Sequence, residues 1–120
     1  MRTITVPAPG SLQTGREGMA RLLDDGYRPD AIFCSSDALA QGVLAEVQSR
    51  GMSIPEDVAV MGFGDLSFAA YTFPALTTVR IDRRAIGRIA ADAMLARMDG
   101  RADVEKVIDV GFEVIERAST

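Results

Sequence analysis

The sequence predicts an α/β fold in which a mainly parallel sheet is flanked by helices in three layers. Wholly apolar runs of strand length alternate with longer segments whose apolar residues recur at helical spacing. A serine or an aspartate stands before each helical segment, where it can cap the first turn. The repeated strand, helix, strand order predicts right-handed crossovers and parallel pairing. The 120 residues, of which 48% are hydrophobic, suffice for one buried core.

The first strand and the first helix are predicted in the N-terminal quarter of the chain. Residues 3–6 alternate polar and apolar side chains, as a short strand does. Ser11 can cap a helix with one apolar face, and Gly26 and Pro29 follow as terminators. A strand, a loop and a helix are therefore expected in this order.

Two apolar strands are predicted on either side of a second helix. Residues 31–34 and 58–61 are unbroken apolar runs. Between them, Ser36 and Asp37 can cap a helix that continues to about Arg50. Continuous apolar runs are typical of parallel strands that are covered on both faces. We therefore expect both strands to be covered on both faces of the sheet.

The remaining elements follow the same alternation. Residues 66–73 are apolar and aromatic, and they predict an irregular segment or a short helix. Residues 77–81 have the β-branched composition of a strand, and Asp82 can cap a third long helix that ends near Gly100. Residues 106–115 alternate in polarity and predict one or two final strands.

Three loops are predicted to gather at one edge of the sheet. They are residues 7–11, 35–37 and 63–66, which follow strands at their carboxyl ends, where open α/β sheets bind ligands. Their hydroxyl and carboxylate groups, with exposed N–H groups at helix starts, suit a polyhydroxylated or anionic small molecule. The side chains concerned are those of Ser11, Ser36, Asp37 and Asp65.

The composition argues against several classes of function. A net charge of −4 opposes DNA binding by this segment alone, because nucleic-acid contact needs clustered Lys and Arg. With no His and one Cys, the usual nucleophile pairs and a zinc site are excluded, although a carboxylate-only reaction stays open. No apolar stretch is long enough to cross a membrane, and the first ten residues lack a signal-peptide pattern. Together with the lone Cys34, this predicts a cytoplasmic protein and weakens most enzyme interpretations. We expect a protein that is not an enzyme, with no catalytic residue, metal or cofactor.

Three ordered blocks of sequence resemble the LacI/GalR repressor family. They are PDAIFCSSDALAQG, GMSIPEDVAVMGFGD and PALTTV, and the closing RAST resembles the family's usual ending. The resemblance implies an allosteric transcription regulator with a periplasmic-binding-protein-like core of two subdomains and a cleft for a sugar or related metabolite. It also implies an N-terminal helix-turn-helix head that binds operator DNA as a dimer. Sugar acids such as gluconate are effectors in this family, and the chain resembles that branch.

On this resemblance, the chain corresponds to the C-terminal part of the effector domain. Residues 1–81 match the second subdomain, residues 82–109 match elements that pack on the first subdomain, and residues 110–120 match the C-terminal strand and tail. The DNA-binding head and the first half of the cleft are expected to be absent. Operator DNA would then be reached only through the missing head.

The resemblance assigns effector contacts position by position. Ser36 falls where many relatives place a small polar residue that touches the effector, and Phe63 matches an aromatic residue beside the cleft. Asp37 matches the acidic position that begins the next helix, where an N-cap role is the alternative to ligand contact. Gly64 stands where relatives commonly have an effector-binding aspartate. Either Asp65 replaces it, or the effector is an anion that a carboxylate would repel.

The second helix resembles the one that forms the family's dimer seam. Leu39, Gly42 and Val43 would bring two copies close, and Phe68 and Tyr71 would add apolar area. The alternative is that Leu39 and Val43 fill the protomer's own core. The third helix would lack the sheet that covers it in the family, so we expect a homodimer or an oligomer with exchanged elements.

Two other classes of function compete with an effector-sensing regulator. A sugar-binding protein of a periplasmic transporter shares the fold, and the sequence upstream would distinguish a helix-turn-helix from a signal peptide. A small flavodoxin-like or Rossmann-like enzyme is the third class. The sequence carries no phosphate-binding loop, complete dinucleotide fingerprint or histidine base that would support it.

Overall fold

The computed structural model describes residues 1–101 and 107–120, which form two compact units. The first unit is Met1–Arg80 together with Val114–Thr120, and the second is Ile81–Glu113. All three candidate ligand loops lie in the first unit.

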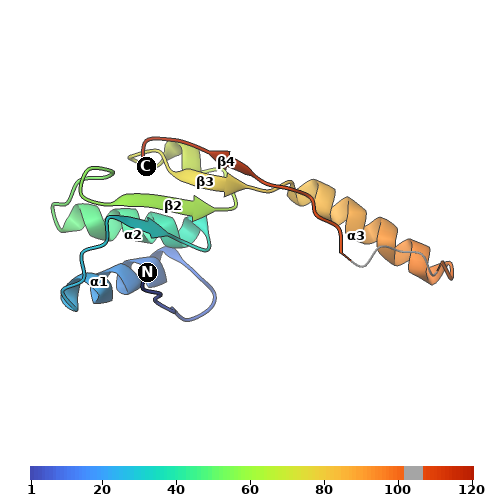
Figure 1. Cartoon of the computed structure of the whole chain (residues 1–120), viewed down its shortest axis with the longest axis horizontal. Helices are drawn as coiled ribbons and strands as arrows, with labels where there is room; N and C mark the ends of the chain where they lie inside the picture. Colours follow the sequence, from blue (N-terminus) through green and yellow to red (C-terminus); the bar gives the residue numbers. More distant parts are fainter. Residues whose placement is uncertain (102–106) are drawn as a thin grey trace. The chain divides into compact units, whose positions relative to one another are not determined.

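The first unit alternates helices and strands. Its elements are α1 (Leu12–Asp24), β1 (Ala31–Phe33), α2 (Asp37–Ser49), β2 (Ala59–Phe63), the 3-10 turn η1 (Ala69–Tyr71) and β3 (Thr77–Arg80). β1 pairs with β2, and β2 pairs with β3, both in parallel. β4 (Glu113–Ile115) follows β3 in the sheet order (Figure 1). The predicted α/β class, with a mainly parallel sheet flanked by helices, is confirmed.

Local capping contacts determine where α1 and α2 begin. The Ser11 hydroxyl accepts a hydrogen bond from the N–H of Thr14 at 3.2 Å, and the Ser11 N–H donates to the Thr14 hydroxyl at 2.9 Å. The Ser36 hydroxyl accepts from the N–H of Leu39 at 3.3 Å. These contacts satisfy N–H groups that have no partner within the helix. Ser36 is therefore the N-cap of α2, and Asp37 is its first helical residue.

α1 and α2 touch through two glycines. A Cβ atom at Gly15 would overlap the backbone of Leu39, and a Cβ atom at Gly42 would overlap the carbonyl oxygen of Leu12. Any larger residue at either position would push the helices apart. The two helices therefore pack with their backbones in close approach.

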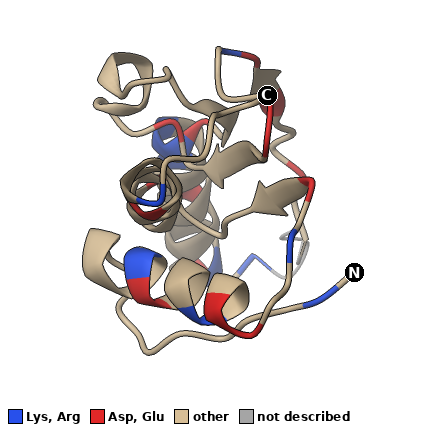
Figure 2. Cartoon of the chain, turned by 90° about the vertical axis from the view of Figure 1, so that its left-hand side faces the viewer, with Lys and Arg blue, Asp and Glu red and all other residues tan. Residues whose placement is uncertain are grey.

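The apolar core lies between the helices and one face of the sheet. Charged residues are spread along α1, but its buried residues belong to the core (Figure 2). Buried and half-buried positions alternate along β2, and Phe33 of β1 is 62% exposed. The described part of the first unit therefore covers one face of the sheet, and the expected cover on the second face is absent from it. The core residues are Met19, Leu23, Cys34, Ala40, Val43, Leu44, Val47, Val58, Val60, Ala69 and Leu76.

The second unit is a long helix followed by an irregular segment. α3 (Arg83–Met98) begins at Asp82, whose carboxylate accepts from the N–H of Ala85 at 2.8 Å, and it ends just before Gly100. Ala96 is the one buried residue of this helix. A groove of about 420 Å³ runs along its apolar face. It is lined by Ile86, Ile89, Ala90, Ala93, Met94, Arg97, Ile108 and Val110.

One predicted strand is not formed, and the predicted C-terminal strand region forms one short strand. Residues 3–6 make no strand pairing, because alternation favours an extended chain but a strand also needs a ladder of hydrogen bonds with a neighbour. Residues 107–112 are also irregular, since Gly111 has a positive φ of 69° and its N–H donates to the Asp109 carboxylate at 2.8 Å. Only β4 forms there, and position 106 lies outside the described residues.

None of the helices in the described ranges has both the length and the apolar character needed to cross a membrane.

Candidate functional site

The three predicted loops meet around the first turn of α2. The parallel register brings Phe33 beside Met61, so β1 and β2 end at the same edge of the sheet. The loop before α1 reaches α2 at Gly10, where an added Cβ would lie 3.1 Å from the Leu39 side chain. The loop after β2 reaches α2 through the N–H of Leu66, which donates to the Asp37 carboxylate at 2.6 Å.

Asp37 is a buried structural carboxylate. Its side chain is 0% exposed, and its two oxygens accept from the Thr78 hydroxyl at 2.5 Å and from the Leu66 N–H at 2.6 Å. A Cβ atom at Gly62 would overlap this carboxylate, so the strand residue must be glycine. Asp37 thus joins α2 to β3 and to the loop after β2. The N-cap role expected for Asp37 belongs to Ser36, and ligand contact by Asp37 stays a prediction.

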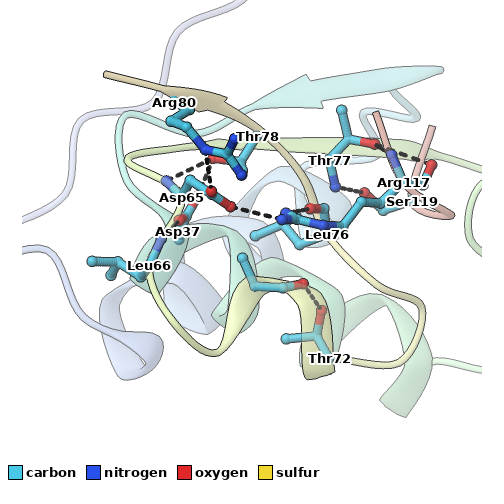
Figure 3. Close-up of polar contacts among 11 residues, drawn as sticks. Asp37, Asp65, Leu66, Thr72, Leu76, Thr77, Thr78, Arg80, Arg117 and Ser119 are labelled. Atoms are coloured by element: carbon cyan, nitrogen blue, oxygen red, sulfur yellow. Dashed lines mark hydrogen bonds and ion pairs between the residues drawn. The ribbon is translucent and has the colours of Figure 1, made fainter. Parts of the chain in front are cut away.

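Asp65 is paired with two arginines (Figure 3). Its carboxylate accepts from Arg80 Nε at 2.7 Å and from Arg117 Nη2 at 2.8 Å, and its side chain is 13% exposed. Burial by itself would raise the pKa of Asp65, but the hydrogen bonds from Arg117 and Arg80 outweigh it and hold the pKa below its ordinary value. Asp65 is therefore an ionised carboxylate that already has cationic partners.

The other predicted contact residues lie at the same edge. Phe63 and Gly64 are half-buried, and Gly64 has a φ of 120° that favours glycine. Its N–H donates to the Val79 carbonyl at 2.8 Å. Ser11 and Ser36 are also half-buried, and the Ser36 hydroxyl, which accepts from α2, can still donate to a ligand.

The proposed dimer residues divide into two groups. Gly42 faces α1, and Val43 is 5% exposed in the core, so both pack inside this chain as the alternative interpretation held. Leu39 is half-buried against the same core. Phe68 is half-buried, whereas Tyr71 is 87% exposed. Surface that a second copy can reach therefore lies at η1 and not at Gly42 or Val43.

Sequence reasoning missed the residues that hold the loop after β2. Thr78, Arg80 and Arg117 make direct contacts with Asp37 or Asp65. Arg117 lies 52 positions from Asp65, and no periodicity connects the two. The PALTTV block contains Thr78 and the RAST ending contains Arg117, but both identified a family and not a contact.

A cavity of about 880 Å³ lies next to the loops and includes one loop residue in its lining. Residues 1–6, α1 and β1 supply most of its lining, which also includes Ser35 and Leu39. The lining is mainly apolar, whereas a site for a polar small molecule needs several convergent polar groups. The candidate site is therefore placed at the loop edge. No three His, Cys, Asp or Glu side chains in the described ranges are grouped to hold a metal ion.

Residues 2–120 match the periplasmic binding protein-like domain. The chain is 41% identical over 117 residues to the HTH-type transcriptional regulator GntR of Pseudomonas aeruginosa, covering 98% of this chain and 34% of that protein. It superposes with a TM-score of 0.83 on the structure of a putative LacI-family regulator from Sanguibacter keddieii, at 38% identity over 96% of this chain and 45% of the other. The chain belongs to the LacI/GalR family.

A third similarity concerns a LacI/GalR-type fold with a bound sugar. The chain matches the transcriptional regulator CelR in its complex with cellobiose with a TM-score of 0.85, at 28% identity, covering 92% of this chain and 34% of CelR. The chain thus spans about a third of the P. aeruginosa relative and less than half of either solved structure. The family that the three sequence blocks indicated is confirmed.

Proposed function

We propose that this chain is an effector-sensing segment of a LacI-type transcription regulator, and that its three loops form one wall of a small-molecule site. The observation that carries the proposal is the meeting of these loops around the first turn of α2. The relatives support it, because they are transcription regulators and CelR binds cellobiose. Such a regulator acts in the cytoplasm, and DNA contact would come from a helix-turn-helix outside this sequence.

We propose effector contacts for the loop side chains whose polar groups or aromatic surface are not already used within the chain. Ser11 and Ser36 offer hydroxyls, and Phe63 offers an aromatic surface beside them. Asp65 contributes through its position in the loop, because its carboxylate is already bound by arginines. Asp37 is buried and holds the loop after β2 through the Leu66 N–H, so we do not propose it as an effector contact.

The charge of this wall favours a sugar acid over a neutral sugar. Gly64 removes the carboxylate that relatives commonly place at this position. The two remaining carboxylates, Asp37 and Asp65, are engaged by hydrogen bonds within the chain. No exposed negative charge from these residues therefore opposes an anionic effector.

Isothermal titration calorimetry of the full-length regulator tests both parts of the proposal. We expect D-gluconate to bind and D-glucose not to bind, and we expect Ser36→Ala to weaken gluconate binding about tenfold, as the loss of one hydrogen bond does. Ser53→Ala, at an exposed turn, is the matched control and should bind as the wild type does. Binding of glucose alone would exclude the sugar-acid assignment, and an undiminished Ser36→Ala affinity would exclude this site.

A further inference from the structure

The C-terminal tail is built into the sheet between β2 and β3. Ser119 is 0% exposed, and its hydroxyl donates to the Val60 carbonyl at 2.6 Å and accepts from the Thr77 N–H at 2.9 Å. Its carbonyl accepts from the Val60 N–H at 2.8 Å, and its N–H donates to the Ala75 carbonyl at 3.0 Å. β2 and β3 pair directly from Met61 and Thr77 onward. Just before that pair, Ser119 lies between the two strands and hydrogen-bonds to both.

Arg117 extends from this anchored tail to the candidate site. Its N–H donates to the Thr77 hydroxyl at 2.8 Å, and its Nη1 donates to the Leu76 carbonyl at 2.7 Å. Its Nη2 then donates to the Asp65 carboxylate at 2.8 Å (Figure 3). The Arg117 side chain is 16% exposed, whereas that of Arg80 is 49% exposed. Arg117 is therefore the more buried of the two cationic partners of Asp65.

The backbone of Asp65 has an unusual conformation that contacts such as the one with Arg117 help to maintain. Asp65 has a φ of 45°, a left-handed conformation that residues other than glycine rarely adopt and that surrounding contacts must maintain. The Asp65 N–H reaches the Thr78 hydroxyl at 3.3 Å, and that hydroxyl donates to Asp37. The next residue, Leu66, is held by the other oxygen of Asp37. The tail secures one side of the loop, and Asp37 secures the other.

We propose that Arg117 is a positioning residue of the effector site. Its guanidinium, fixed by the tail, holds the Asp65 carboxylate and so sets the conformation of residues 63–66, which form part of the wall. Arg117 acts through Asp65 and makes no contact with the effector. This inference rests on the proposed function for its meaning, while the coupling of the tail to the loop is measurable without any ligand.

Hydrogen exchange followed by mass spectrometry tests the coupling in this 120-residue chain. Arg117→Met should speed exchange of residues 63–66 about tenfold, the effect of losing a hydrogen bond to a charged group, and leave α1 unchanged. Asp65→Asn should act similarly from the loop side with the tail bonds intact, which covers the case in which Arg117→Met unfolds. Arg21→Met, at an exposed position of α1, should change nothing in the loop. Unchanged loop exchange in Asp65→Asn and in any folded Arg117→Met would overturn the proposal.

A double-mutant cycle on binding separates positioning from other roles. The ligand is whichever of D-gluconate and D-glucose the full-length wild type binds. Arg117→Met and Asp65→Asn should each weaken its binding by the same factor, and the double variant should bind no worse than either single variant. Arg117→Lys should restore part of the affinity. Additive losses would mean that Arg117 contacts the ligand itself, and unchanged affinity would mean a purely structural role; either result contradicts the proposal. If neither sugar binds, the proposed function fails while the exchange experiment still decides the coupling.

Discussion

Single residues hold the loop edge of the first unit in place, and Asp37 is the central one. Its side chain is fully buried with one donor on each carboxylate oxygen, so the cost of burying this polar group is offset by two short hydrogen bonds. Both donors, the Thr78 hydroxyl and the Leu66 N–H, would be left without this partner if the carboxylate were removed.

Asp37→Ala should lower the free energy of unfolding by about 2–4 kcal/mol, because it leaves donors buried and unsatisfied. Urea unfolding followed by circular dichroism measures the difference. Asp92→Ala, at an exposed position of α3, is the control and should change stability by less than about 0.5 kcal/mol. Equal stability of the two variants would contradict the structural role assigned to Asp37.

The packing of α1 against α2 depends on the close approach of their backbones and on an ion pair between them. α1 and α2 meet at Gly15 and Gly42, and Glu46 of α2 accepts from Arg16 of α1 at 3.1 Å and from Arg50 at 2.9 Å. Backbone contact and an ion pair thus act at the same helix interface. Each can be tested by itself.

Gly42→Ala should destabilise the chain by about 1–3 kcal/mol, because the new methyl group would overlap the Leu12 carbonyl oxygen. Gly87→Ala is the matched control in α3, where an added Cβ meets nothing within 4 Å. That change should stabilise the helix by up to about 1 kcal/mol. Thermal unfolding of both variants gives the comparison, and a neutral Gly42→Ala would show that the helices do not meet at this position.

The stabilising contribution of Glu46 should disappear in acid. Hydrogen bonds from Arg50, opposed by burial and helped by Arg16, keep the pKa of Glu46 below its ordinary value of 4.5. The contribution is therefore fully present above about pH 4.5 and is lost as the pH falls through the lower folded-state pKa. Urea unfolding at pH 7 and at pH 3 should show a smaller gap between wild type and Glu46→Gln at the lower pH. A gap that does not change with pH would refute this account.

Among the residues that the structure describes, the second unit exposes several large apolar side chains. Met94, Leu95 and Met98 of α3 are 65%, 59% and 79% exposed, and Phe112 is 74% exposed. Exposed apolar side chains that gather on a soluble protein often mark a contact surface. In water this surface favours association with a second copy.

Sedimentation velocity at micromolar concentration should therefore detect dimers or larger species of this chain. Met94→Glu should shift the distribution toward the monomer, because it puts a charge into the groove on α3. Arg88→Ala, which changes the net charge equally at another exposed position of α3, should not. A monomeric wild type would remove the self-association proposal.

Helix starts depend on contacts between neighbouring residues, so they could be predicted from the amino-acid order. Ser11, Ser36 and Asp82 cap helices through contacts three residues away, and these positions were readable from the order of residues. The edge at which residues 35–37 and 63–66 gather also followed from the strand order, since parallel strands end on the same side. Residues 7–11 reach this edge without a strand before them.

The contacts that fix this loop edge join residues far apart in the sequence, and they could not be predicted from the sequence. The partners of Asp37 lie 29 and 41 positions away, and Arg117 lies 52 positions from Asp65. Residues 3–6 alternate like a strand and yet form none, because pairing depends on a neighbouring edge. Capping and periodicity act within a few residues, whereas a buried carboxylate or a ladder bond depends on which distant segment the packed chain brings to it.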